Sequence, residues 1–303
     1  MIVVAIDTGG TKIAGAAVDE DGNILHQLSY PNSGRTGPFI LDTYTRIVDE
    51  MQKRFPLCAI GIGAGGRIDP TEGTVLFSTD IYKEYVGLHI GRIMSRRCGL
   101  PVAVDNDCRV AVYGERWKGA AAGFDDIFGV ILGTGVGGGY ILEGRPVFGA
   151  GKGAGEVGHF ILHPDGRRCA CGQRGCVEQY LSGTSLWQSY NRRTGGETLS
   201  SGYAFFQRLQ DDDKAAEEIM DAFVADLALC AVSLSNLLSP QGILFGGGLI
   251  DTADRWWSRF ESAYGELGNK HCRSTVLLRA ATGNNAALLG AAWLAFTRLG
   301  KSV

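Results

Sequence analysis

The stretch IVVAIDTGGTKIAGAAVD, residues 2–19, predicts a buried strand, a glycine loop and a second strand. The β-branched run at its start is typical of a strand buried on both faces. Asp21 and Gly22 then provide the residues of a hairpin turn, which leads into a third strand at residues 24–30. The order is therefore strand, glycine loop, strand, acidic turn, strand.

The same unit recurs about 125 residues further along the chain. DIFGVIL (126–132) predicts a strand, GTGVGGG (133–139) a glycine loop, and the strands that follow are separated by a turn at Glu143-Gly144. Weaker copies occur at 58–77 and 242–250, and between them the spacing of apolar residues predicts helices at 38–54, 85–98, 106–121, 179–190, 214–238, 253–268 and 284–299. Two β-rich halves with interleaved helices predict an α/β fold with a cleft between two domains.

Composition excludes several classes of protein. The chain has 303 residues, 45% of them hydrophobic, and a formal net charge of −3, which argues against binding through a nucleic-acid backbone. The start MIVVAIDTGG has no basic region typical of a signal peptide, and the sequence suggests no apolar run of about 18–20 residues. We therefore expect a cytoplasmic protein with no membrane or nucleic-acid partner, in which Cys58, Cys98, Cys108, Cys230 and Cys272 are reduced.

The glycine loops do not fit the common nucleotide motifs. GTGVGG matches G-x-G-x-x-G, but a dinucleotide site needs a helix directly after the loop, and here strands follow. DTGGTK lacks the spacing of a P-loop. Glycines in two such loops suit backbone N–H groups that converge on phosphate oxygens, with Asp7 placed to manage Mg²⁺ and with Thr11 and Lys12 adding a hydroxyl and a charge. The alternative is that both loops are ordinary tight turns.

An acid-base candidate lies in PVAVDNDCRVAVYGE, where a predicted strand runs into a helix. Asp107 stands at this junction with Asn106 beside it. In the functional interpretation, Asp107 accepts a proton from a substrate hydroxyl and Asn106 orients it, as phosphoryl transfer requires. In the alternative interpretation, Asp107 only caps the helix.

Together these motifs resemble the ROK sugar kinases of the hexokinase–actin superfamily over nearly the whole chain. The resemblance is carried by DTGGTK (7–12), DND (105–107), GTGVGGG (133–139), GEVGHF (155–160), CACGQRGCVEQY (169–180) and FGGGLI (245–250). It implies a two-domain, ribonuclease H-like fold around a cleft. The smaller domain would comprise residues 1–116 and the C-terminal helix 289–303, and the larger domain residues 117–288.

The resemblance also implies site residues. Asp107 matches the catalytic base and Asn106 its sugar-binding neighbour. The other sugar contacts would be Gly65, Gly66, Glu156, His159 and Glu178, and the ATP and Mg²⁺ contacts would be Asp7, Gly9, Gly10, Thr11, Lys12, Gly133, Thr134, Gly135, Gly247 and Gly248. Homodimers are common in such kinases. Two segments depart from the pattern near the sugar side, STDIYKEYVG (78–87) and Cys108-Arg109, and they affect acceptor identity rather than phosphoryl transfer.

His159, Cys169, Cys171 and Cys176 are four good zinc ligands, which would close a tetrahedral structural site. A redox centre would need a C-x-x-C pair, which is absent, and reduced surface cysteines without metal are the remaining alternative. His163 could replace His159, although the resemblance favours His159. The metal would hold Glu156, His159 and Glu178 in place, so that its loss weakens sugar binding and leaves the nucleotide loops intact.

The sequence therefore predicts an ATP- and Mg²⁺-dependent kinase that phosphorylates a hexose at its primary 6-hydroxyl, with glucose favoured. N-acetylglucosamine or N-acetylmannosamine is the alternative acceptor, because one sequence does not show whether an acetamido group fits. A non-catalytic, sugar-responsive regulator is the alternative of another class. It is disfavoured because the first glycine loop begins near residue 7 and leaves no room for a preceding helix-turn-helix domain.

Overall fold

The computed structural model describes residues 1–78, 82–196 and 199–301, and the chain forms two compact units. Unit 1 comprises 1–123, 148–154 and 284–303, and unit 2 comprises 124–147 and 155–283. These bounds differ from the domain boundaries placed after residues 116 and 288. The segment 148–154 belongs to unit 1 because the guanidinium of Arg109 donates to the carbonyl of Lys152, at 2.9 Å, and lies over the ring of Phe148.

Unit 1 is built on a five-stranded sheet in the order β3-β2-β1-β4-β7, in which β1, β4 and β7 are parallel. The chain between β4 and β7 forms a separate two-stranded sheet, β5-β6. The elements are β1 (Ile2–Thr8), β2 (Lys12–Asp19), β3 (Ile24–Pro31), α1 (Gly37–Gln52), β4 (Leu57–Ala64), β5 (Arg67–Asp69), β6 (Thr74–Phe77), α2 (Ile90–Cys98), β7 (Val102–Asn106), α3 (Asp107–Lys118) and α9 (Ala286–Arg298).

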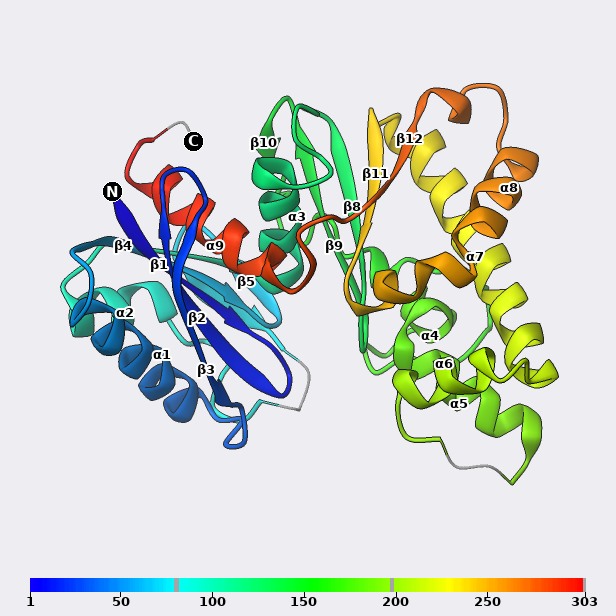
Figure 1. The fold of residues 1–303 in the computed structure, drawn as a ribbon, viewed down its shortest axis with the longest axis horizontal. Coiled ribbons are helices and arrows are strands. Elements are labelled where there is room, and N and C mark those ends of the chain that lie inside the picture. The colour runs from blue at the N-terminus through cyan, green and yellow to red at the C-terminus, as the bar shows by residue number, and fades with distance from the viewer. Residues whose placement is uncertain (79–81, 197–198, 302–303) are drawn as a thin grey trace. The chain divides into compact units, whose positions relative to one another are not determined.

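The central strand β1 is buried on both faces, which explains its continuous apolar run. Val4 and Ile6 pack in a core cluster with α1, whereas Val3 and Ala5 pack in a second cluster with α9. Figure 1 shows these helices on opposite faces of the sheet. Helices therefore pack on both faces of the sheet and fix the strands near whose ends Asp7 and Asn106 lie.

Unit 2 repeats the topology of unit 1, with the strand order β10-β9-β8-β11-β12 and with β8, β11 and β12 parallel. The repeat read from the sequence is therefore confirmed at the level of strand order. Its elements are β8 (Ile127–Leu132), β9 (Val136–Leu142), β10 (Arg145–Pro146), α4 (Glu178–Leu181), α5 (Gly183–Thr194), α6 (Gly202–Gln210), α7 (Lys214–Leu238), β11 (Gly242–Gly246), α8 (Trp257–Leu267) and β12 (Val276–Arg279), with short 3₁₀ turns at Val157–His159, Gly248–Arg255, Cys272–Ser274 and, at the junction with unit 1, Gly283–Asn285.

Several predicted helices are corrected. The helix expected at 85–98 begins only at Ile90, and the one expected at 179–190 is two helices interrupted at Ser182, whose hydroxyl caps the second. Helix α6 was not predicted. Most of these errors fall at caps and turns, where local hydrogen bonds rather than apolar spacing decide where a helix begins.

Helix α7 corrects the expectation that no segment is long and apolar enough to cross a membrane. Its 25 residues meet that test by length and composition. The helix packs through Met220, Phe223 and Leu227 into the core of unit 2. Its apolar composition is accounted for by this packing, as in a core helix of a globular domain.

Candidate active site and metal centre

The predicted residues of unit 1 gather where its three parallel strands end. Asp7 on β1 lies opposite Gly63 on β4, and Gly63 lies opposite Asp105 on β7. The carboxyl ends of parallel strands open toward the same edge of a sheet, which is where α/β proteins bind ligands. Asp7, Gly65, Gly66, Asn106 and Asp107 are all at or just beyond this edge.

The helix cap at this edge is Asn106, not Asp107. The side-chain oxygen of Asn106 accepts from the backbone N–H of Arg109 at 3.0 Å, which is the N-cap bond of α3. Its amide nitrogen donates to the carbonyl of Gly66 at 2.9 Å and to Oδ1 of Asp107 at 2.8 Å. The alternative in which Asp107 serves as the cap is therefore wrong.

Asp107 is the first residue of α3 and is only partly buried. Its Oδ1 accepts from the side chain of Asn106 and from the backbone N–H of Cys108 at 2.9 Å. These two donors orient the carboxylate at a helix N-terminus, where the dipole favours negative charge. The geometry suits a carboxylate that receives a proton from a bound hydroxyl.

Asp7 lies close to Asp107. A methyl group placed on Gly63 would be 3.7 Å from Oδ1 of Asp7 and 3.6 Å from Cα of Asp107, so both acids border the same glycine. Burial, followed by the nearby Asp107 carboxylate, raises the pKa of Asp7 to about 7, against the opposing effect of Lys12. A cation held between these acids would relieve this repulsion, which fits the predicted Mg²⁺ role of Asp7.

Because Asp7 has a raised pKa when folded, the ligand-free protein should lose stability as pH rises through about 7. The folded state holds a proton on Asp7 that the unfolded chain releases above pH 4. Asp7→Asn should flatten this dependence, and we expect its free energy of unfolding to gain roughly 1–3 kcal/mol on wild type between pH 5 and pH 8. Urea unfolding at both pH values measures this. Asp42→Asn, on the surface, should follow wild type, and equal pH slopes for Asp7→Asn and wild type would contradict the expectation.

The first glycine loop is held by two residues that sequence reasoning missed. The side-chain amide of Asn32 donates to the carbonyl of Gly9 at 2.9 Å, and the guanidinium of Arg35 donates to the carbonyl of Gly10 at 3.2 Å. Gly10, Thr11 and Lys12 are exposed. Because two of its carbonyls already accept hydrogen bonds from these side chains, the loop can present its backbone N–H groups to a phosphate.

Gly65 and Gly66, the two glycines predicted on the sugar side, lie in different steric surroundings. Gly66 adopts a positive φ of 87°, and a side chain there would meet the carbonyl of Phe77 at 2.5 Å. Gly65 faces the ring of Tyr82, which a Cβ would approach to 3.5 Å. Burial, followed by the Asp107 carboxylate, raises the pKa of Tyr82. Of the divergent segment 78–87, residues 79–81 lie outside the described residues.

A buried ion pair supports the turn that carries Asp107. Asp105 and Arg109 are 0% and 3% exposed, and Nε of Arg109 donates to Oδ1 of Asp105 at 2.7 Å, with a second bond from Nη2. Tyr113 donates to the other carboxylate oxygen at 2.6 Å. Arg109 also donates to the carbonyl of Ile68 at 3.0 Å. The sequence placed Arg109 near the sugar side, but the structure makes it an internal support of the α3 N-terminus.

The glycines predicted for unit 2 lie at the ends of neighbouring parallel strands. Gly133–Gly135 follow β8, and Gly247 and Gly248 follow β11, which pairs with β8. Gly247 has a positive φ of 87°, and a Cβ there would lie 2.4 Å from the carbonyl of Leu132. The structure thus brings the two predicted nucleotide loops of this unit together.

Glu178 contacts the second glycine loop directly. Its Oε2 accepts from the backbone N–H of Val136 at 3.0 Å, and a Cβ on Gly135 would lie 2.3 Å from the same oxygen. The backbone of Gly183 donates to the carbonyl of Gly133, and the Thr184 hydroxyl donates to that of Thr134. Glu178 therefore links the segment that follows the Cys/His cluster to the second glycine loop, a contact that the sequence did not reveal.

The four predicted metal ligands converge. The ligand atoms of His159, Cys169, Cys171 and Cys176 all lie within 4.8 Å of one another. Nδ1 of His159 is 3.8 Å from Sγ of Cys169, and the Sγ atoms of Cys171 and Cys176 are 3.6 Å apart. Ligand atoms bound at about 2.0–2.3 Å to one tetrahedral zinc ion would be separated by roughly 3.5–3.8 Å, so the set fits zinc.

Around this cluster, Gln173 is a support that the sequence did not reveal. Its side-chain amide donates to the carbonyl of His159 at 3.1 Å and contacts Sγ of Cys171 at 3.5 Å. Burial opposes ionisation of Cys171, but hydrogen bonds from the backbone and side chain of Gln173, together with those from Cys169 and Cys176, lower its pKa to about 7. His163 instead pairs through Nε2 with Asp226 at 2.7 Å, so it is not the fourth ligand.

Glu156 precedes the short 3₁₀ turn Val157–His159, and His159 is the last residue of that turn. Because Nδ1 of His159 faces the cysteines, its other ring nitrogen remains for a second contact. The predicted site residues thus form two groups, one at the sheet edge of unit 1 and one around the glycine loops and metal cluster of unit 2. In the described ranges all eight cysteines are free of disulfides.

Comparison with known proteins finds a family match and related sugar kinases. The model of the ROK family matches residues 3–298. The glucokinase of Streptomyces coelicolor is 32% identical over 97% of both chains, and the N-acetyl-D-glucosamine kinase of Escherichia fergusonii is 31% identical over 80% of this chain and 82% of its own. A solved ROK glucokinase from Streptomyces griseus, in complex with glucose and AMPPNP, is 30% identical, covers 98% of this chain and 100% of its own, and superposes with a TM-score of 0.85.

Proposed function

The chain belongs to the ROK family and is an ATP-dependent sugar kinase, and we propose that it phosphorylates glucose at the 6-hydroxyl. The observation that carries the chemistry is the carboxylate of Asp107, oriented by two donors at the start of α3 with Asp7 beside it. Phosphoryl transfer needs little more from a protein than a base for the hydroxyl, a metal ion and correct positioning.

In the proposed reaction, Asp107 accepts the proton of the 6-hydroxyl while the hydroxyl oxygen attacks the γ-phosphorus of ATP in line. The bond from that phosphorus to the bridging oxygen breaks, and ADP leaves. Asp7 would hold Mg²⁺, which neutralises charge on the phosphates when bound. The loops at Gly9–Lys12 and Gly133–Gly135 would donate backbone N–H groups to the phosphates, and Gly247 and Gly248 would border the nucleoside. We propose that substrate binding excludes water from the reaction.

The sugar contacts follow the same proposal. Glu156, Glu178 and the free ring nitrogen of His159 would bind sugar hydroxyls, together with Asn106 and the loop at Gly65-Gly66. Zinc at His159 and the three cysteines would hold two of these residues in place without taking part in the chemistry. Since Asn106 is already bonded to Gly66 and Asp107, its main contribution would be to orient these groups.

We further propose a cytoplasmic enzyme that acts as a homodimer.

Glucose leads as acceptor because a glucokinase relative spans 97% of the chain and a solved relative holds glucose. N-acetylglucosamine is the second candidate, supported by a kinase of that sugar at 31% identity. A coupled assay with glucose, mannose, N-acetylglucosamine and N-acetylmannosamine tests the choice. We expect the highest kcat/KM with glucose. A higher kcat/KM with an acetamido sugar would replace glucose with that acceptor, and no turnover with any sugar would reject the kinase.

Removal of zinc with a chelator should raise the glucose KM by about 10–100-fold, because misplaced binding groups lose their contacts. Since Glu178 contacts Val136, a smaller rise in the KM for ATP should accompany it. Steady-state kinetics on metal-free protein, with zinc content measured in parallel, give both values, and restored zinc should reverse them. An unchanged glucose KM in protein shown to be zinc-free would contradict the proposed role of the metal.

A further inference from the structure

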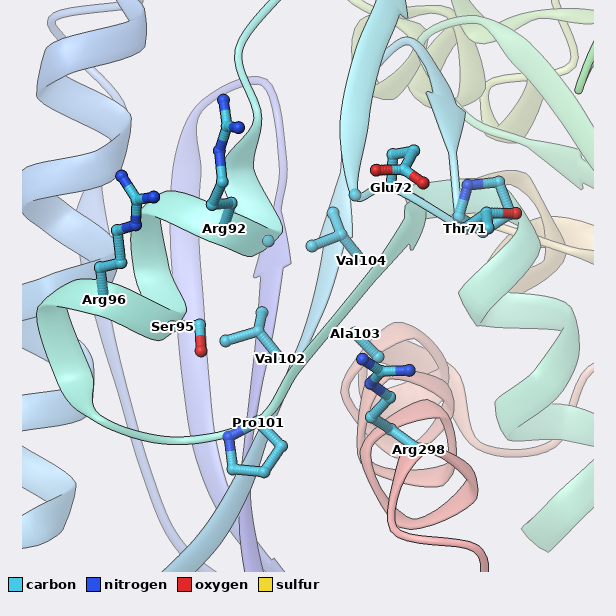
Figure 2. A pocket seen from close by; sticks show the side chains of 13 residues that line it. Thr71, Glu72, Arg92, Ser95, Arg96, Pro101, Val102, Ala103, Val104 and Arg298 are labelled. Carbon is cyan, nitrogen blue, oxygen red and sulfur yellow. The ribbon is translucent and has the colours of Figure 1, made fainter.

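A groove of about 430 Å³ in unit 1 lies beside the start of β7, whereas Asn106 and Asp107 lie at the end of that strand. Figure 2 shows Arg92 and Arg96 projecting from α2 on one side of β7 and Arg298 projecting from α9 on the other. The remaining polar side chains in the lining are Ser95, Thr71 and Glu72. The volume is in the range of pockets that hold small molecules.

The floor of the groove is the edge of the sheet. Residues 102–104 belong to β7, which pairs only with β4, and no strand in the described part of the chain covers its outer side. An uncovered strand edge presents backbone donors and acceptors. The groove therefore offers hydrogen-bonding groups from the main chain as well as from side chains.

The charge of the lining is unusual for a chain of net charge −3. Arg92, Arg96 and Arg298 are exposed, and within residues 1–78, 82–196 and 199–301 none of them forms a hydrogen bond or an ion pair. By contrast Arg97, on the same helix, is bonded to Asp42 at 2.8 Å. Three guanidinium groups thus border one groove with Glu72 as the only carboxylate in its lining.

We propose that this groove binds a phosphorylated sugar at a site separate from the catalytic one. A phosphate monoester carries a charge of about −1.5 to −2 at pH 7 and accepts the paired N–H groups of arginine. Glu72 and Ser95 supply an acceptor and a hydroxyl for sugar hydroxyl groups. Because three exposed side chains must lose rotamer freedom on binding, we expect a Kd of roughly 0.1–1 mM.

The experiment titrates glucose 6-phosphate into the full chain by calorimetry, with and without saturating glucose and AMPPNP. Binding that persists with both present reports the groove. Arg92→Ala/Arg96→Ala and Arg298→Ala should each weaken this binding at least about tenfold, and inorganic phosphate should compete with it. Arg97→Ala is the matched control on α2 and should bind as wild type. Circular dichroism checks that the exposed substitutions leave the fold unchanged.

Two results would overturn the proposal. One is the absence of any glucose 6-phosphate binding that depends on Arg92, Arg96 or Arg298. The other is unchanged binding in these variants together with an altered oligomeric state by light scattering, which would make the groove an interface between protein chains. The comparison of variants requires no kinase activity, so failure of the proposed function and failure of the groove site are distinguishable.

Discussion

Asp107→Asn is expected to lower kcat by about 10²–10⁴-fold while the KM values for sugar and ATP change only a few-fold. The asparagine oxygen can still accept from Asn106 and from the backbone of Cys108, so the turn keeps its geometry. What is lost is the capacity to take up a proton as the phosphoryl group is transferred. Steady-state kinetics with purified wild type and variant measure the effect.

The control is Asp42→Asn, the same chemical change at a side chain that is 72% exposed in the same unit. It removes one surface ion pair and should leave kcat within about twofold of wild type. Unfolding in urea checks that Asp107→Asn is as stable as wild type within about 1 kcal/mol. Full activity of a folded Asp107→Asn variant would remove Asp107 from its proposed role.

The second large effect is expected on stability. Arg109→Met should lower the free energy of unfolding by about 3–5 kcal/mol, because it leaves Asp105 buried without its counter-charge. Burial already raises the pKa of Asp105 despite Arg109, and loss of the guanidinium removes an opposing effect. The deficit should therefore be smaller at pH 5 than at pH 8, because protonation neutralises Asp105.

A double-mutant cycle separates the ion pair from simple loss of packing. Asp105→Asn combined with Arg109→Met leaves no buried charge, so it should be more stable than Arg109→Met alone. The turn that carries Asn106 and Asp107 should also be less well positioned in Arg109→Met, with kcat reduced more than the KM for ATP. Additive losses of stability in the cycle would show that the pair has no special energetic role.

The sequence predicted the architecture well where the signal was periodic. The duplicated unit of strands and glycine loops predicted two β-rich halves, because a run of β-branched residues before a glycine loop leaves little alternative to a buried strand. The structure adds that the two sheets have the same strand order. The cluster of His159, Cys169, Cys171 and Cys176 was equally readable, since thiolates and imidazole within a short loop are good ligands for a metal such as zinc.

The site contacts that the sequence did not reveal have one common physical origin. Asn32 and Arg35 hold a loop more than 20 residues away in the chain, and Arg109 reaches the carbonyls of Ile68 and Lys152. Such contacts leave no local pattern in the sequence, because any other polar residue at these positions would give the same spacing of polar and apolar residues. Glu178 shows the same limit, since its bond to Val136 spans 42 positions.

The sequence by itself therefore indicated the repeated unit of strands and glycine loops, the positions of those loops and of the His/Cys cluster, and the family to which the chain belongs. Only the tertiary structure decided that Asn106 rather than Asp107 caps α3 and that Arg109 is an internal counter-charge. It also showed that three arginines with no ion-pair partner among the described residues border one groove. Periodicity and spacing encode local conformation along the chain, whereas burial, charge pairing and the pKa of a group such as Asp7 depend on residues that folding alone brings together.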